Sequence, residues 1–393
     1  MSSALKPLSG VRVLELARIL AGPWCGQILA DLGAEVLKVE RPGLGDDTRL
    51  WGPPFITDVH GDAWGAAYFH ATNRGKKSVC IDFTTLDGQA VLTDLASQAD
   101  VLIENFKLDN LKRYGLDYDT LKKLNPRLIY ASITGFGQAG PYANRAGYDF
   151  VLQGMSGLMD ITGEPDGTPQ KVGVAVVDLF AGVYTSTAIL ASLFRRNATG
   201  KGAYIDMALF DVATAMLANQ GMNYLASGIP PTRLGNAHPN IAPYQVFEVK
   251  DGYIIIAVGN DRQFQACCQV LGAESCSADP AFQTNALRVQ SRQQLTISLS
   301  PYLLTWTRSE LLSALESKGV PAGPINTIED VFSDPQTIYR GMCGDLVDEV
   351  GSIVKTIASP IMIDGVRQSS DLASPKLGSS TAKFDDYKPE SDS

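Results

Sequence analysis

Hydrophobic and polar positions alternate with two different periods along the first part of the chain. Short runs rich in β-branched residues occur at 11–16, 35–40, 78–83, 101–106 and 128–136. Between them lie stretches of roughly 10–15 residues in which apolar side chains have helical spacing. Parallel strands need a crossover of about this length, so the pattern predicts βαβ units. We expect an open, Rossmann-like α/β domain built on a parallel sheet.

A long apolar stretch, residues 179–196, predicts a helix that is buried on most of its faces. Two arginines end the stretch and Gly200 follows it, as is usual at a helix C-terminus. Asp178 stands immediately before this helix, at the end of the strand-like run 172–177. A carboxylate at the edge of an apolar core requires a physical reason.

The pattern changes near residue 240. Two β-like runs flank Asp251 and Gly252, which predicts a hairpin with a tight turn. Helical stretches follow at 262–271, 289–303 and 308–317. These elements predict a second, smaller α/β domain.

The length of the chain, 393 residues with 45% hydrophobic side chains, exceeds that of one ordinary domain. We expect a large domain over 1–205, a linker over 206–224 and a small domain over 225–330. β-like sequence returns from 340, so the segment 340–393 is expected to complete the large domain.

Charge and composition narrow the class of protein. The net charge of -9 argues against nucleic acid or an anionic membrane as the main partner, because the long-range field repels both. Six cysteines without a C-x-x-C pair favour free thiols in a reducing compartment, and three histidines make a zinc site unexpected. The N-terminus has no signal-peptide pattern, and no run of 18 apolar residues occurs. We expect a cytoplasmic protein.

A dinucleotide site is the first chemical hypothesis for such a fold. The first strand leads into Gly22 and a helix, and Glu40 ends the second strand where a ribose-binding acid would stand. The connecting turn, ARILAGPWCG, lacks the G-x-G-x-x-G spacing that lets the backbone approach a pyrophosphate. The sequence therefore does not favour NAD binding.

Basic and polar residues gather at the predicted strand ends. In an open parallel sheet the carboxyl ends of the strands form the ligand crevice, and cations collected there by an acidic protein suit a phosphorylated cofactor. The alternative is that they are solvated surface charges. The residues are Arg41 after the second strand, Asn73, Arg74, Lys76 and Lys77 before the third, Asn105, Phe106 and Lys107 after the fourth, and Lys112 and Arg113 beyond it.

Two interpretations of Asp178 follow from its position. It can be the N-cap of the helix that it precedes, although Ala181 replaces the acid of a capping box. It can also be a nucleophile, since a helix N-terminus favours the ionised carboxylate and exclusion of water makes that carboxylate more reactive. The residues alone leave both open.

Several motifs along the whole chain resemble family III CoA-transferases of the CaiB/BaiF type, the group of formyl-CoA transferase, carnitine CoA-transferase and the 2-methylacyl-CoA racemases. They are LSGVRVLELARILAGP, DLGAEVLKVERPGLGD, NRGKKSVCID, ADVLIENF, NPRLIYASITGFGQAGPY, VVDLFAG and TGKGAYIDMALFD. The resemblance implies two α/β domains per chain and two chains interlocked as a homodimer. It implies acyl-CoA and small carboxylates as substrates, with no tightly bound cofactor.

The same resemblance assigns roles to residues. Asp178 falls on the catalytic aspartate, which attacks the acyl-CoA thioester and passes through mixed anhydrides and an aspartyl-CoA thioester. The mobile loop of the family corresponds to residues 234–244, here without a glycine run, with Gly235 and Asn236 as the matching positions. The residues implied to bind the nucleotide of CoA are Arg41, Thr72, Asn73, Arg74, Gly75, Asn105, Phe106, Lys107 and Arg113. Those implied to bind its thiol arm are Thr134, Gly135, Phe136 and Gly137.

Two other functions are weighed against CoA transfer. A racemase needs a histidine base where this chain has Tyr148, and a phenol is a poor base at neutral pH. A non-catalytic CoA-binding protein would have no activity that depends on Asp178. For a transferase, succinyl-CoA is the expected donor, and the acceptor is a small acid of the itaconate, glutarate, citramalate or mesaconate type. Its second carboxylate would need an arginine fork or a helix end, and the candidate arginines are Arg18, Arg49, Arg74 and Arg233.

Overall fold

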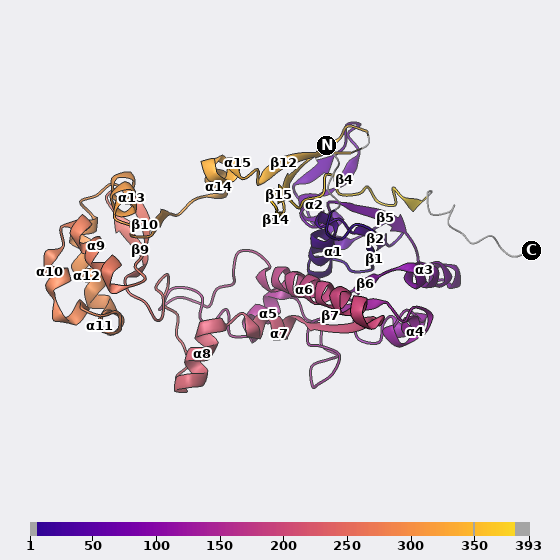
Figure 1. The fold of residues 1–393 in the computed structure, drawn as a ribbon, viewed down its shortest axis with the longest axis horizontal. Coiled ribbons are helices and arrows are strands. Elements are labelled where there is room, and N and C mark those ends of the chain that lie inside the picture. The colour runs from indigo at the N-terminus through magenta and orange to yellow at the C-terminus, as the bar shows by residue number, and fades with distance from the viewer. Residues whose placement is uncertain (1–5, 349, 382–393) are drawn as a thin grey trace, which may run out of the picture. The chain divides into compact units, whose positions relative to one another are not determined.

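A computed structural model of the chain describes residues 6–348 and 350–381, which divide into two compact units (Figure 1). Unit 1 contains the chain up to Ser156, Gly173–Met216 and the part from Pro335 onward, and unit 2 contains Gly157–Val172 and Leu217–Asp334. The chain therefore enters unit 2 twice. The expected linker 206–224 instead contains the end of a strand, a complete helix and most of another helix.

Unit 1 is built on a six-stranded parallel sheet with the order β5-β2-β1-β6-β7-β8. The expected α/β fold with a parallel sheet is confirmed, and the sheet also has a sixth strand, β8, that the hydrophobic pattern did not predict. The strands are β1 (Arg12–Glu15), β2 (Glu35–Glu40), β5 (Lys76–Cys80), β6 (Val101–Glu104), β7 (Ile129–Thr134) and β8 (Ala203–Ala208).

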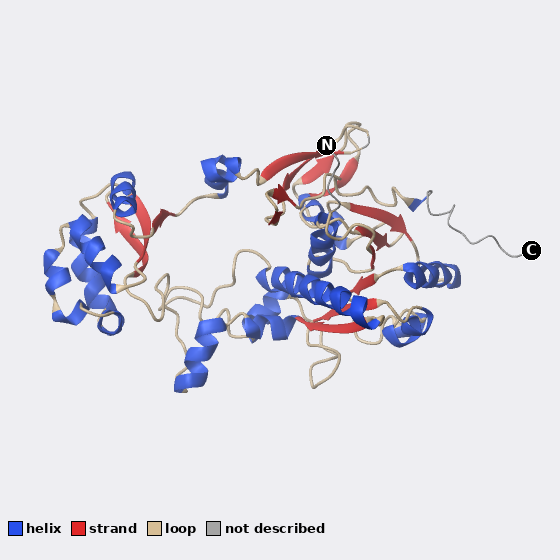
Figure 2. Cartoon of the chain, in the orientation of Figure 1, coloured by secondary structure: helices blue, strands red, loops and turns tan. Residues whose placement is uncertain are grey.

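Alternating side chains of these strands enter two separate cores. Val13 and Val101 pair in register and face a core shared with helices α1 (Ala21–Asp31) and α6 (Val176–Thr199). Their neighbours Leu14 and Leu102 face the opposite core, shared with α3 (Leu86–Gln98) and α4 (Tyr118–Leu124). Each buried leucine or valine stabilises the fold by roughly 1.5–3 kcal/mol relative to exposure. Helices thus cover both faces of the sheet (Figure 2).

Helix α6 is apolar and long enough, by length and composition alone, to cross a membrane. Its packing explains the composition differently, because Val177, Ala181, Ile189 and Leu193 belong to the core beneath α1. Gly182 lies where the two helices approach most closely: a β-carbon there would stand 2.8 Å from the carbonyl oxygen of Ala21. The start of α1 is therefore held against the first turns of α6.

The chain from Pro335 returns along the edge strand β5, with hydrogen bonds to Gly75 and Ser78. The remaining elements of unit 1 are short. They are the 3-10 helices η1 (Asp47–Leu50) and η2 (Lys112–Tyr114), the helices α2 (Ala67–His70), α5 (Asp149–Met155), α7 (Leu209–Ala215) and α15 (Pro335–Tyr339), and the strand pairs β3 (Phe55–Thr57) with β4 (Ala63–Ala66), β12 (Cys343–Val347) with β13 (Ile353–Ile357), and β14 (Met362–Ile363) with β15 (Val366–Arg367).

Unit 2 has its own core around a three-stranded antiparallel sheet. The predicted hairpin is confirmed: β9 (Tyr244–Val249) pairs with β10 (Gly252–Ala257), and β11 (Ala322–Pro324) adds to β10. Its helical elements are α8 (Ala218–Ser227), α9 (Asp261–Leu271), α10 (Glu274–Ala278), η3 (Pro280–Phe282), α11 (Asn285–Gln290), α12 (Arg292–Leu303), α13 (Arg308–Ser317) and α14 (Ile328–Ser333).

Candidate active site

The loop after β1 is fixed at the carboxyl end of the sheet. The side-chain amide of Asn105 accepts a hydrogen bond from the Arg18 backbone N–H at 2.9 Å and donates one to the Arg18 carbonyl at 2.7 Å. The next residue, Ile19, has a φ of 72°, which is strained for a β-branched side chain. Its N–H donates to both carboxylate oxygens of Asp46 at 3.3 Å. Asn105 and Asp46 therefore hold this loop in a conformation that it would not otherwise keep.

A buried network of three cations and three carboxylates supports the loop from below. Lys38 lies 3.0 Å from Glu15 and 2.9 Å from Asp46, and all three side chains are fully buried. Burial opposes the charge of Lys38, but the two carboxylates outweigh it and raise its pKa. Lys76 pairs with Glu15 at 2.8 Å, while burial lowers the pKa of Lys76 to about 8. Arg49 and Glu40 complete the network with a two-pronged ion pair. Its charges compensate one another inside the protein.

Helix α6 is capped by an aspartate from another helix. The carboxylate of Asp149, in α5, accepts hydrogen bonds from the backbone N–H groups of Val177 at 2.8 Å and Asp178 at 3.3 Å. Gln153 donates to the second oxygen of Asp149 at 2.6 Å. The helix begins at Val176, and its N-cap residue, Ala175, has no capping side chain. The interpretation of Asp178 as the N-cap is therefore wrong: its carboxylate is free for another role.

The electrostatics of Asp178 differ from the sequence-based expectation. The helix N-terminus was expected to keep this carboxylate ionised. Instead, burial and the charge of Asp149 raise the pKa of Asp178 to about 7. The carboxylate that exists near neutral pH is consequently more basic, and more nucleophilic, than that of an exposed aspartate.

The segment Thr134–Gly137 after β7 is tied to the same place. A β-carbon on Gly135 would lie 2.7 Å from the Cα atom of Gly147, so the two backbones touch and neither residue can carry a side chain without a shift. Gly147 is two residues before Asp149. The hydroxyl of Thr134 accepts the N–H of Gly137 at 2.9 Å, which closes the turn. Phe136 packs against Phe210 of α7. The structure thus brings the expected thiol-arm segment beside the cap of α6.

Aromatic rings and guanidinium groups line up beyond the end of β6. Phe83 contacts Phe106 at 5.6 Å and Tyr114 at 5.4 Å between ring centroids. Arg18 lies over Phe106 and Arg113 over Tyr114. Such a row can stack a purine ring while its cations meet phosphates. Three of the expected CoA-binding residues, Asn105, Phe106 and Arg113, therefore belong to one surface, and Arg41 and Lys107 are exposed at neighbouring strand ends.

Comparison with known proteins identifies the family. The sequence profile of CoA-transferase family III matches residues 8–381, nearly the whole chain. The chain belongs to CoA-transferase family III. The expected enzyme class, CoA transfer, is thereby confirmed.

Relatives of this CoA-transferase match it along almost their full length. It is 54% identical to a succinate–glutarate CoA-transferase of Agrobacterium fabrum over 98% of this chain and 96% of the relative, and 41% identical to a succinyl-CoA:glutarate CoA-transferase of Mus musculus over 96% and 85%. A CaiB/BaiF family protein from Brucella suis superposes with a TM-score of 0.86 at 55% identity, covering 98% of this chain and 100% of that one. A hypothetical protein from Mycobacterium tuberculosis gives 0.85 at 31% identity over 96% and 99%.

The segment Thr72–Gly75 of the CoA-transferase, which we expect to bind CoA, makes several contacts within unit 1. Arg74 forms an ion pair with Asp31 at 2.6 Å and donates to the carbonyl of Ile357. Asn73 donates to the Phe69 carbonyl and accepts from Lys76, and the Thr72 hydroxyl accepts from Asn73. Gly75 has a φ of +77° and packs against Ser370. These polar side chains are buried and hydrogen-bonded within unit 1, and their contact with CoA stays a prediction.

The expected mobile loop, residues 234–244, lies in unit 2 of the CoA-transferase. Arg288 donates to the carbonyl of Ala242, and Arg292 donates to the carbonyls of His238 and Pro239. Gly235 has a φ of +57° and donates its N–H to Gly163 at 3.0 Å, whereas the Asn236 side chain has no hydrogen bond to another described residue. Side chains therefore anchor the second half of the loop, and only its first half lacks such anchors.

The four candidate arginines for an acceptor carboxylate differ in availability. Arg49 and Arg74 are buried in ion pairs, and Arg233 in unit 2 pairs with Asp160. Arg18 is the accessible one in unit 1: its side chain is 45% exposed and pairs with Asp47 at 2.6 Å. Tyr148, at the position where a racemase needs histidine, is 67% exposed and directly precedes Asp149.

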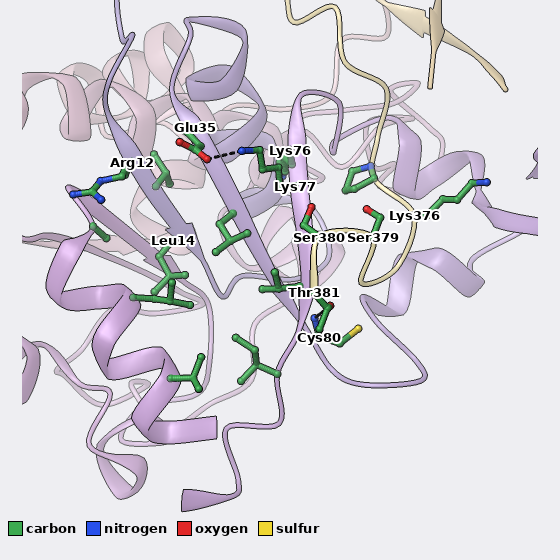
Figure 3. A pocket seen from close by; sticks show the side chains of 18 of the residues that line it. Arg12, Leu14, Glu35, Lys76, Lys77, Cys80, Lys376, Ser379, Ser380 and Thr381 are labelled. Atoms are coloured by element: carbon green, nitrogen blue, oxygen red, sulfur yellow. Dashed lines mark hydrogen bonds and ion pairs between the residues drawn. The ribbon is translucent and has the colours of Figure 1, made fainter. Parts of the chain in front are cut away.

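A groove of about 1360 Å³ lies on the opposite side of the sheet from α6. Leu14 of β1, Val79 of β5, Val91 and Leu95 of α3 and the returning segment 372–381 line it, and Figure 3 shows this segment running beside β5. Asp178 is absent from its lining. The groove therefore is not the catalytic pocket, although it has the volume for a ligand.

The sequence alone does not identify Asp149, which directly follows Tyr148, the residue at the position of the racemase base. The local signal available was an acidic residue at the first position of a helical run, DFVLQGM. That signal predicts an acidic residue that stabilises the N-terminus of the helix to which it belongs. It does not predict that the carboxylate caps a different helix that begins 27 residues later.

Proposed function

We propose that this CoA-transferase moves CoA from succinyl-CoA to glutarate or a similar C5 dicarboxylate. The relatives with 54%, 41% and 40% identity are named for succinate or succinyl-CoA and glutarate, and others with 38% and 36% for mesaconate and D-citramalate. The observation that carries the reaction is Asp178, a carboxylate of raised pKa in the first turn of α6, in the same unit as the predicted CoA surface.

In the proposed mechanism, an oxygen of Asp178 attacks the thioester carbonyl of succinyl-CoA. The C–S bond breaks, its electron pair leaves with the CoA thiolate, and a succinyl-aspartyl anhydride remains. The thiolate then attacks the Asp178 carbonyl, which releases succinate and gives an aspartyl-CoA thioester. Glutarate attacks this thioester to form a second anhydride, and the thiolate attacks its glutaryl carbonyl. Glutaryl-CoA leaves and the Asp178 carboxylate is restored, so the thioester energy is conserved.

Two features of unit 1 support this sequence of steps. Asp178 needs no accompanying cation to stay reactive, since burial and Asp149 keep its carboxylate basic. The Phe83–Phe106–Tyr114 rings with Arg113 offer a surface for the nucleotide of CoA. Arg18 is our candidate for the distal carboxylate of the acceptor, as its guanidinium is exposed next to the fixed β1 loop. A cytoplasmic homodimer, expected from the sequence, is part of the same proposal.

The decisive experiment is incubation of the purified protein with succinyl-CoA and a panel of dicarboxylates. We expect glutaryl-CoA formation, and after hydroxylamine or borohydride trapping a mass change on the peptide that carries Asp178. Asp178→Ala should lose both while retaining CoA binding. No CoA exchange with any acceptor, and no adduct on this peptide, would sink the mechanism.

The same experiment separates the alternatives. Exchange of the α-deuterium of a 2-methylacyl-CoA without CoA transfer would favour a racemase. Binding of CoA with no turnover of any acyl-CoA, unaffected by Asp178→Ala, would favour a non-catalytic CoA-binding protein.

A further inference from the structure

Three polar side chains form a row across the carboxyl ends of neighbouring strands. Glu104 of β6 pairs in register with Ser132 of β7, which pairs with Asp206 of β8. Side chains alternate between the two faces of a sheet, so the row lies on the face of Leu102 and Tyr130, opposite to α6. Glu104 and Ser132 are buried, whereas Asp206 on the edge strand is exposed. Buried polar groups at the end of an apolar face need hydrogen-bond partners.

Gln138 attaches the turn after β7 to this row. Its side-chain amide donates to the Ser132 hydroxyl at 2.9 Å, and its backbone N–H donates to the Asp206 carboxylate at 3.1 Å. The turn itself, Thr134–Gly137, is the segment expected to meet the thiol arm of CoA. Gln138 directly follows this turn and is half-buried. It therefore fixes the end of the turn to the sheet on the side of the row.

Contacts on the α6 side of the sheet connect the same turn with Asp178. Phe136 of the turn packs against the core beneath α6. The backbones of Gly135 and Gly147 touch, and two residues after Gly147 the carboxylate of Asp149 caps the helix that carries Asp178. The turn is thus held between the polar row and this helix cap. A shift of the turn would move a bound thiol arm relative to the attacking carboxylate.

The expected nucleotide segment is attached to the row independently. The Glu104 carboxylate accepts the backbone N–H of Phe106 at 2.8 Å, and the Phe106 ring contacts Phe83 in the aromatic surface. Both hydrogen bonds of Gln138 go to other members of the row. Loss of the Gln138 amide should therefore leave the nucleotide surface unchanged while it loosens the thiol-arm turn.

The reaction needs a fixed thiol-arm turn. Attack on a thioester requires the carbonyl carbon to lie about 3–3.5 Å from the attacking oxygen. The arm of CoA between its nucleotide and its sulfur has many rotatable bonds, so a well-bound nucleotide does not place the acyl group. A turn that is held on both faces of the sheet supplies the missing constraint.

We propose that Gln138 is a positioning residue for CoA transfer, whose amide, held on the Ser132 hydroxyl, fixes the thiol-arm turn so that the acyl carbonyl lies within reach of Asp178. Gln138 acts through the turn and takes no part in the bond changes. The inference rests on the proposed function, because this position matters only if Asp178 attacks a bound acyl-CoA.

The first test is Gln138→Met, which keeps the length of the side chain and the backbone bond to Asp206 but removes the amide donor. We expect kcat with succinyl-CoA and glutarate to fall about tenfold or more. The dissociation constant of adenosine 3′,5′-bisphosphate, the nucleotide end of CoA, should change by less than about twofold. A kcat within about twofold of the natural value, or a parallel loss of nucleotide affinity, would overturn the proposal.

The matched control is Gln98→Met in α3. Gln98 likewise donates its side-chain amide to a neighbour, Asp94, at 3.1 Å, but it lies on an exposed helix surface. This variant should keep full activity. A fall in kcat equal to that of Gln138→Met would show that the loss is not specific to the turn.

A second variant isolates the contact itself. Ser132→Ala removes the hydroxyl that accepts the Gln138 amide and replaces it with a small apolar group at a buried position. If this contact positions the turn, Ser132→Ala lowers kcat as well, and adding Gln138→Met to it costs no further activity, as expected for one shared interaction. Two losses that multiply would show that Gln138 acts without Ser132, against the proposal.

Failure of this inference is distinguishable from failure of the proposed function. Turnover that is lost in Asp178→Ala but fully kept in Gln138→Met rejects only the role of Gln138. A natural protein that transfers CoA to no acceptor rejects the proposed function, and the role of Gln138 with it.

Discussion

Two groups of acidic side chains lie near the same end of the unit 1 sheet. They differ in whether cations lie beside the carboxylates. In the network of Glu15, Lys38, Lys76, Asp46, Glu40 and Arg49, each carboxylate has a cation within hydrogen-bonding distance. Asp178 and Asp149 instead face each other with no cation bridging them among the described residues. Compensation fixes the pKa values of Asp46 and Glu40 below their ordinary range. Asp178 has no such compensating cation, and burial and Asp149 raise its pKa. One group maintains the fold, and the other retains reactivity.

The largest effect should come from removing the uncompensated carboxylate. Asp178→Asn keeps the shape of the side chain, yet we expect turnover to fall by at least about 10³-fold because the nucleophile is lost. Steady-state assays with succinyl-CoA and glutarate check this. Residual turnover above about a tenth of the natural rate would contradict it.

The same substitution should stabilise the protein at alkaline pH. Because the folded-state pKa of Asp178 is raised to about 7, its contribution to stability is present below the unfolded-state pKa and is lost as the pH rises through about 7. Asp178→Asn removes this loss, so we expect a gain of about 1–3 kcal/mol at pH 8 and about a third of that gain at pH 5. Urea unfolding at both pH values measures it. An equal effect at the two pH values would show that the charge is not the cause.

Removing a cation from the compensated network should change stability with the opposite dependence on pH. Lys38→Met leaves Glu15 and Asp46 buried without their cation, which costs about 3–5 kcal/mol of unfolding free energy. Because the lowered pKa of Asp46 depends on Lys38, the damage should be large above pH 4 and shrink as the pH falls and Asp46 becomes protonated. Denaturant curves from pH 3 to 7 provide the test. A loss of turnover without loss of stability would contradict the assignment of this network to the fold.

A smaller change should follow from altering the cap. Asp149→Asn can still accept the N–H groups of Val177 and Asp178, but it removes the negative charge beside Asp178. We expect the acidic limb of the kcat profile to move to lower pH by up to about one unit, with a stability cost of about 1 kcal/mol or less. Asp160→Asn, in unit 2, is the control. An unmoved acidic limb would mean that burial alone sets the pKa of Asp178.

The smallest effect concerns the exposed cation nearest to this region. Arg18→Gln breaks an ion pair with Asp47 that is largely solvent-exposed, so the unfolding free energy should change by less than about 0.5 kcal/mol. The KM for glutarate should rise about 5–10-fold, while that for a monocarboxylate acceptor should stay constant. Equal increases for both acceptors would instead point to a contact with CoA.

The hydrophobic pattern predicted the parallel sheet because five of its strands lie in or next to short apolar runs, and most of their residues are buried. β8 was missed, since its sequence AYIDMA alternates buried and exposed positions at the edge of the sheet. The start of α6 was placed too late for a related reason. Val176 and Val177 extend a valine-rich run that resembles a strand, and only tertiary packing makes them the first turn of a helix.

The site was harder to predict because the roles of its residues depend on contacts with residues that are distant in sequence. Arg74 was assigned to CoA on a motif, but Asp31, 43 positions earlier, and the carbonyl of Ile357 occupy its guanidinium. Asp149 caps a helix that no local pattern connects with it. The isolation of Asp178 in apolar sequence makes it a residue of interest, whereas its raised pKa depends on a neighbour that only the fold supplies.

Gly182 allows the first turns of α6, which carry Asp178, to pack closely against α1. One turn after Asp178, it lets the carbonyl of Ala21 approach to a distance at which no β-carbon is tolerated. The distance between the start of α6, which carries Asp178, and the start of α1 therefore depends on the absence of a side chain at Gly182 in the core. A Gly182→Ala change is therefore expected to shift the first turns of α6, which carry Asp178, away from the start of α1.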